Sequence, residues 1–159
     1  MGLNTDTGGV VVNADIKLSN RYTTWNTRLD KIGQTDNELI IVSFSLANVS
    51  YIEKILSKRE NGRGITLIGN TAYYKNAVSL KRMLPEMKIY VHPQVHAKLI
   101  LYAPDTVWLS SENIGHRPKA FDATIEIESD FVYNHYFSQV ESLFRSRDIY
   151  EIKEVQNHA

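Results

Sequence analysis

Residues 96–113 read His-Ala-Lys-Leu-Ile-Leu-Tyr-Ala-Pro-Asp-Thr-Val-Trp-Leu-Ser-Ser-Glu-Asn, and this stretch decides the fold that we expect. Two runs rich in strand-forming residues, 96–102 and 106–111, flank the turn residues Ala-Pro-Asp at 103–105. Two such runs joined by a short loop predict a β-hairpin. The rest of the domain is expected to be built around this hairpin.

The polar residues of the hairpin gather on one face of each strand. Because alternate residues of a strand point to the same side, His96 and Lys98 are expected to share a face, and so are Ser111 and Asn113. The hairpin then brings an imidazole, an ammonium group, a hydroxyl and an amide together, a set that could attack and neutralise a phosphate. The opposite face of the first strand is apolar and is expected to pack on the core: Ala97, Leu99 and Leu101.

The segments around the hairpin alternate between strand-like and helix-like patterns. Further strands are expected at residues 38–45, 64–69, 87–92 and 123–128, which are short and mainly apolar runs. Helices are expected at residues 15–32, 48–58, 72–84 and 133–147, where apolar residues recur at helical spacing. Asn48 or Ser50 is expected to cap the second helix, and Thr71 the third. This order predicts an α/β domain with a mixed, largely buried β-sheet flanked by helices.

Composition narrows the class of protein. Residues 1–14 are expected to be a flexible N-terminus, and residues 15–159 a single domain. Basic and acidic residues number 18 each, so the net charge of zero neither favours nor excludes a nucleic-acid partner. The absence of cysteine excludes disulfides, thiolate catalysis and zinc–thiolate sites. No stretch approaches the roughly 18 apolar residues that span a bilayer, so we expect a soluble, cytoplasmic protein without a membrane partner.

The order and spacing of the polar residues resemble the signature of the phospholipase D superfamily. A His-x-Lys unit, His96 and Lys98, is followed fifteen residues after the lysine by Asn113, with Ser111 two residues before that asparagine. The form with one such unit per chain resembles the short bacterial Nuc-type endonucleases. The resemblance extends over most of residues 38–147 and implies a phospholipase D-like domain.

The strand expected at 123–128 supplies a carboxylate to this signature. Its polar face is expected to comprise Asp122, Thr124, Glu126 and Glu128. The family pattern has a glutamate a little over ten residues past the asparagine, and Glu126 fits this position better than Glu128. Glu126 is expected to accept the Nδ1–H of His96, which would leave Nε2 free to attack phosphorus.

Three positions depart from the family pattern. Ala103 stands where the family has an aspartate, and the nearest acid is Asp105, in the turn. Ser110 replaces a glycine, and Glu112 stands where an apolar residue is more usual. If the strand continues through this position, Glu112 is expected to point away from the residues that face the phosphate.

The resemblance implies a metal-independent phosphodiesterase that needs no cofactor. In the family, one histidine forms a phosphohistidine intermediate, and a second protonates the leaving oxygen and then activates water. Lys98 and Asn113 would bind phosphate oxygens, with help from Ser111. Because this chain holds one His-x-Lys unit, the resemblance implies a homodimer whose two His96 side chains share one active site. The small size favours a nuclease over a lipid-acting enzyme, with DNA favoured over RNA.

Other interpretations stay open. The Ser111 hydroxyl could instead bond the backbone. The basic loop of His116, Arg117 and Lys119 could contact substrate phosphates or could be a solvated surface loop. The whole chain could be a non-catalytic nucleic-acid-binding module of the same fold, or a protein-interaction factor of another class.

Overall fold

A computed structural model describes residues 3–4, 9–10, 12–19, 29–114 and 122–154. Its main feature is an eight-stranded sheet with the strand order β10-β6-β5-β4-β7-β8-β9-β3. These strands are β3 (Asp15–Ser19), β4 (Leu39–Ser43), β5 (Ile65–Asn70), β6 (Lys88–His92), β7 (Lys98–Tyr102), β8 (Thr106–Ser110), β9 (Asp122–Glu128) and β10 (Tyr150–Glu151). Two further short strands, β1 (Leu3–Asn4) and β2 (Gly9–Val10), pair with each other.

The sheet is mixed, as the sequence predicted. Strands β4, β5 and β6 are parallel and are connected through the helices α2 (Val49–Leu56) and α3 (Tyr74–Met83). Strands β7, β8, β9 and β3 continue the sheet in antiparallel pairings, beginning with the predicted hairpin of β7 and β8. The α/β fold class and the hairpin are therefore confirmed.

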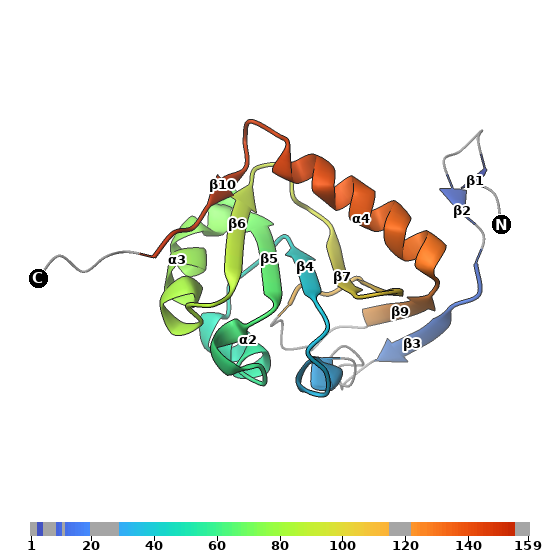
Figure 1. The fold of residues 1–159 in the computed structure, drawn as a ribbon, viewed down its shortest axis with the longest axis horizontal. Helices are drawn as coiled ribbons and strands as arrows, with labels where there is room; N and C mark the ends of the chain where they lie inside the picture. The colour runs from blue at the N-terminus through green and yellow to red at the C-terminus, as the bar shows by residue number, and fades with distance from the viewer. Residues whose placement is uncertain (1–2, 5–8, 11, 20–28, 115–121, 155–159) are drawn as a thin grey trace, which may run out of the picture.

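Helices cover both faces of the sheet. One core lies beneath α2, α3 and the 3-10 turn η1 (Asp30–Gly33), and a second lies beneath the long helix α4 (Asp130–Phe144), which crosses the sheet in Figure 1. Strand β4 lies between the parallel strand β5 and the hairpin strand β7, and all five of its residues are buried. A strand that is covered on both sides reads as a continuous apolar run, which explains why this segment has no polar–apolar alternation.

The prediction that one face of the 122–128 strand is polar and the other faces the core is wrong. Asp122 and Thr124, on the expected polar face of β9, are buried. The physical reason is that helices or η1 pack against both faces, so alternation alone does not expose a residue in this part of the sheet. His96 is exposed because it precedes β7, where the ladder has not yet begun.

The prediction of a helix over residues 15–32 is also wrong. Residues 15–19 form β3, which pairs antiparallel with β9, and residues 30–33 form the 3-10 turn; residues 20–28 lie outside the described ranges. Pairing with the edge of β9 outweighs the helical spacing of the apolar residues. The other predicted elements occur within a few residues of their expected limits. Asn48 caps α2, and Asn70 rather than Thr71 caps the 3-10 turn η3 (Thr71–Tyr73) that leads into α3, by accepting from the Ala72 N–H.

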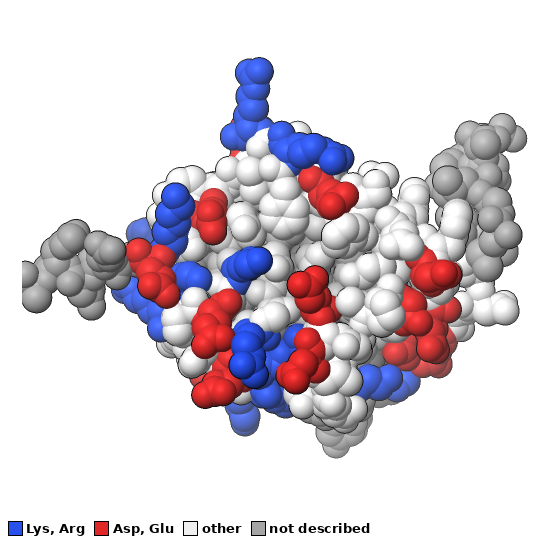
Figure 2. All heavy atoms as spheres, in the orientation of Figure 1, with Lys and Arg blue, Asp and Glu red and all other residues white. Residues whose placement is uncertain are grey.

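In the described part of the chain, no helix has the length and apolar character needed to cross a bilayer. The face shown in Figure 2 carries basic and acidic side chains of the described residues interspersed with one another. On this face, as in the chain as a whole, neither sign of charge dominates.

Candidate active site

The His-x-Lys unit lies where strand β4 ends. In the antiparallel pairing of β4 with β7, Ser43 at the carboxyl end of β4 faces Lys98 at the start of β7. The Lys98 ammonium donates to the His96 carbonyl oxygen at 3.3 Å, which keeps the two residues close. The His96 imidazole packs against the ring of Phe44, with 5.1 Å between ring centroids. An exposed imidazole and a half-buried cation thus share one edge of the sheet.

Asn113 joins this edge through hydrogen bonds to the end of β4. Its Oδ1 accepts from the Ser45 N–H at 3.0 Å, and the Ser43 hydroxyl lies 3.5 Å from the same oxygen. The Ser43 hydroxyl also accepts from the Ile114 N–H at 3.1 Å. Because Oδ1 is turned to these donors, the Nδ2 group of Asn113 is the part of the amide that can donate to a ligand. The structure therefore brings His96, Lys98 and Asn113 to one place.

Ser111 has its contacts on the neighbouring strand. Its hydroxyl donates to Asp122 Oδ1 at 2.8 Å and accepts from the Ala123 N–H at 3.0 Å. These contacts correspond to the alternative in which this hydroxyl bonds the backbone and tightens the pairing of strands. A role of Ser111 in phosphate binding stays a prediction.

Glu126 is held further along the sheet. Its Oε1 accepts from Trp108 Nε1 at 3.0 Å and from Lys31 Nζ at 3.2 Å. It faces Trp108 across the β8–β9 pair, whereas the end of β9 nearer to the site is the end at Asp122. Among the described residues, the ring contact of His96 is with Phe44. The Glu126 carboxylate thus contacts Trp108 and Lys31 in this structure, and its predicted bond to His96 stays a prediction.

Asp122 is a residue whose place the sequence did not single out. It is buried, and its Oδ1 accepts from the Ser111 hydroxyl, whereas its Oδ2 is buried without a hydrogen-bond partner among the described residues. Its only signal in the sequence was its alternation with Glu126 along β9. Glu112 is also buried, with 2% of its surface exposed, so its carboxylate lies inside the protein rather than on the solvated surface of the site.

The remaining site predictions have no structural test. His116, Arg117 and Lys119 lie outside the described residues. Within the described ranges, no group of three or more His, Asp or Glu side chains has an arrangement that could hold a metal ion.

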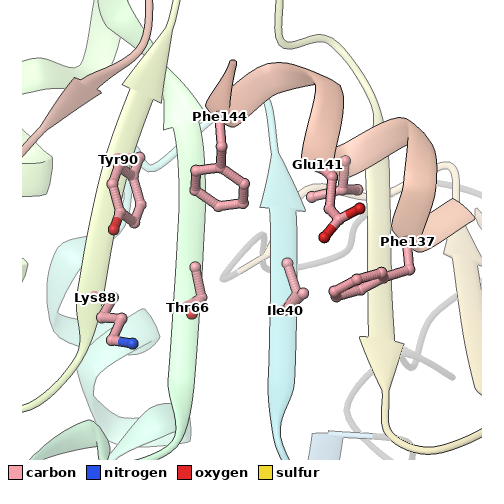
Figure 3. Close-up of a pocket in the computed structure, with 8 residues that line it drawn as sticks. Ile40, Thr66, Lys88, Tyr90, Phe137, Glu141 and Phe144 are labelled. Atoms are coloured by element: carbon pink, nitrogen blue, oxygen red, sulfur yellow. The ribbon is translucent and has the colours of Figure 1, made fainter. Parts of the chain in front are cut away.

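A separate groove opens on the α4 side of the sheet. Its volume is about 300 Å³. Figure 3 shows Phe137 and Glu141 of α4 on one side of it and Lys88 and Tyr90 of β6 on the other. Burial raises the pKa of the Tyr90 hydroxyl, with a further contribution from the Glu151 carboxylate. None of the residues that line this groove is among His96, Lys98 and Asn113, so the groove is distinct from the site at the end of β4.

Comparison with known proteins gives similarity in structure alone. No protein-family model and no curated protein sequence matches the chain. The solved structure of Nuc from Salmonella typhimurium, a phospholipase D family member, superposes with a TM-score of 0.70 at 9% identity, covering 89% of this chain and 99% of Nuc. NucT from Helicobacter pylori gives a TM-score of 0.64 at 12% identity, covering 84% of this chain and 98% of NucT.

Two larger proteins contain the same fold as part of their chains. The phosphatidylserine synthase of Haemophilus influenzae Rd KW20 matches with a TM-score of 0.65 at 8% identity, over 87% of this chain and 39% of the synthase. TrmBL2, an archaeal chromatin protein that binds DNA, matches with a TM-score of 0.60 at 10% identity, over 89% of this chain and 55% of TrmBL2. The eight-stranded mixed sheet and these superpositions agree that the protein has the fold of the phospholipase D superfamily.

Proposed function

We propose that the protein is a metal-independent phosphodiesterase that cleaves nucleic acid, DNA in preference to RNA, at a site shared by two copies of the chain. One observation carries the proposal. The exposed His96, the Lys98 cation and the amide of Asn113 meet at the end of β4, with Asn113 Oδ1 turned inward to the Ser45 N–H. This arrangement supplies a nucleophile and two donors for phosphate oxygens.

The chemistry follows from these groups. Nε2 of His96 attacks phosphorus, a P–N bond forms, and the P–O bond to the leaving oxygen breaks. His96 of the partner subunit gives its proton to the leaving oxygen, then takes a proton from a water molecule that attacks phosphorus and breaks the P–N bond. Lys98 and Asn113 hold the non-bridging oxygens and stabilise the negative charge that builds up on them.

The resemblance of the motif to the Nuc-type endonucleases and the superposition on Nuc support a short phosphodiesterase of this kind. The likeness to TrmBL2, whose structure shows DNA binding, supports DNA as the partner. A cytoplasmic location stays a prediction.

The direct test is cleavage of DNA and RNA in excess chelator. We expect cleavage without divalent ions, and we expect His96→Ala to lower the rate by roughly a thousandfold or more, since the nucleophile is removed. A substrate labelled at the scissile phosphate should leave an acid-labile, base-stable label on His96 when the reaction is quenched. Activity that requires a divalent ion, or that persists unchanged in His96→Ala, would refute the mechanism.

A second function is a DNA-binding module of the same fold without catalysis. The contacts of Ser111 with β9 and the likeness to TrmBL2 favour it. It predicts DNA binding that weakens with salt and no covalent label under any condition.

A further inference from the structure

The backbone that carries His96 has little regular structure of its own. Residues 93–97, which we call the 93–97 segment, connect β6 to β7, and the β7 ladder begins at Lys98. The Val95 N–H closes a turn on the His92 carbonyl oxygen at 3.3 Å. The placement of the imidazole must therefore depend on what holds this segment from outside.

The amide of Asn70 holds it. The Nδ2 group of Asn70 donates to the carbonyl oxygens of Pro93, at 3.0 Å, and of Val95, at 2.9 Å. Both acceptors lie within the four residues that end at His96, and Val95 is its immediate neighbour. Two bonds from one planar amide fix both the position and the orientation of this backbone.

Asn70 is itself fixed. It is the last residue of β5, it is buried, and it faces His92 in the pairing of β5 with β6. Its Oδ1 accepts from the Ala72 N–H at 2.9 Å, so donor and acceptor ends of the amide are both used. An aspartate of the same shape would keep that acceptor and lose both donors, which leaves two carbonyl oxygens facing a carboxylate.

Asn70 also bonds to Phe44, the residue whose ring packs against the His96 imidazole. The Asn70 N–H donates to the Phe44 carbonyl oxygen at 3.4 Å, and the Phe44 ring lies against His96. The segment that bears the nucleophile and the strand end that bears its aromatic support are thus joined through one side chain and its backbone.

We propose that Asn70 is a positioning residue for His96. This rests on the proposed phosphodiesterase function. In-line attack on phosphorus requires the attacking nitrogen at about 3 Å in the right direction, and a displacement of about 1 Å can cost roughly a hundredfold in rate. Asn70 does not touch the phosphate in this scheme, so its loss should slow the chemical step and leave phosphate binding by Lys98 and Asn113 largely intact.

The experiment compares Asn70→Asp with Lys81→Met. Lys81 makes a similar pair of bonds at the opposite end of β6, from Nζ to the carbonyl oxygens of Pro85 at 2.7 Å and Met87 at 2.8 Å. We expect Asn70→Asp to lower kcat on an oligonucleotide by roughly 10- to 100-fold with KM within about threefold. Lys81→Met should keep kcat within about threefold of the wild type, since it disturbs backbone far from His96.

Asn70→Ala serves where the aspartate variant does not fold, and the same split between kcat and KM is expected of it. An unchanged kcat in a folded Asn70 variant, or an equal loss of kcat in Lys81→Met, overturns the proposal.

If the wild type cleaves no phosphodiester, the proposed function fails, and amide hydrogen exchange then decides whether Asn70 holds the 93–97 segment. Faster exchange at Gln94 and Val95 in Asn70→Asp than in Lys81→Met supports that role, and equal exchange overturns it.

Discussion

At the scale of single residues, Ser43 has a larger role than its place at the end of an apolar strand suggests. Its side chain is buried and its hydroxyl lies at hydrogen-bonding distance from three groups: the Ile114 N–H, the Ser45 carbonyl oxygen and Asn113 Oδ1. The hydroxyl has one proton, so it can serve either of the two oxygens at a time while it accepts from Ile114. Ser43 therefore links β4 to the segment that carries Asn113.

The Ser43→Ala variant is expected to lower the free energy of unfolding by about 1–3 kcal/mol, because the Ile114 N–H would be left buried without its acceptor. Ser45→Ala is the matched control, since the Ser45 hydroxyl accepts from the Ala47 N–H in an exposed setting. We expect that variant to cost about 0.5 kcal/mol. Urea unfolding of the three proteins measures both values, and equal losses would contradict the role given to Ser43.

At the scale of elements, the connection from α2 into β5 depends on left-handed backbone. Gly62 and Gly64 have φ values of +75° and +74°. The Asn61 carbonyl oxygen accepts from the Glu86 N–H at 3.0 Å, which ties this connection to the turn that precedes β6. This bond joins the segment before β5 to the segment before β6, next to the point where the two strands begin to pair.

The two glycines should respond differently to alanine. A Cβ on Gly62 would lie 2.8 Å from the Cβ of the buried Met87, whereas a Cβ on Gly64 would lie 3.3 Å from the end of the Arg59 side chain. Both variants carry the strain of a positive φ, so the difference between their free energies of unfolding reports the contact of the new Cβ with Met87. We expect Gly62→Ala to be less stable than Gly64→Ala by about 1–3 kcal/mol in thermal or urea unfolding. Equal stability would show that the core around Met87 adjusts.

At the scale of the whole molecule, one chain supplies one imidazole to a mechanism that uses two. His96 is exposed at the end of the sheet, and the chain holds a single His-x-Lys unit. The proposed activity therefore requires two copies to meet at this edge, related by a two-fold axis.

Mixing of subunits tests this requirement. If dimers exchange subunits, an excess of His96→Ala chains should lower the activity of a fixed amount of wild-type protein by roughly tenfold or more, because nearly every wild-type chain then pairs with an inactive partner. Sedimentation should give a mass of about twice 18.2 kDa. An equal excess of an unrelated, catalytically inert protein is the control for the added protein. Activity that stays proportional to the wild-type chains would show that one chain is sufficient.

The sequence by itself determined the α/β class and the β7–β8 hairpin. These features depend on local alternation and on a short turn, which act between residues close in sequence. The expected helix over residues 15–32 failed because the pairing of β3 with β9 joins segments about a hundred residues apart.

The tertiary structure alone decided the partners of the polar side chains. Ser43 and Asn113 are 70 positions apart, Lys31 and Glu126 are 95 apart, and Asn70 reaches Val95 across 25. No spacing rule within one strand or helix links such residues, because the packing of whole elements brings them together. For the same reason the sequence could not predict that the Glu126 carboxylate accepts from Trp108 and Lys31.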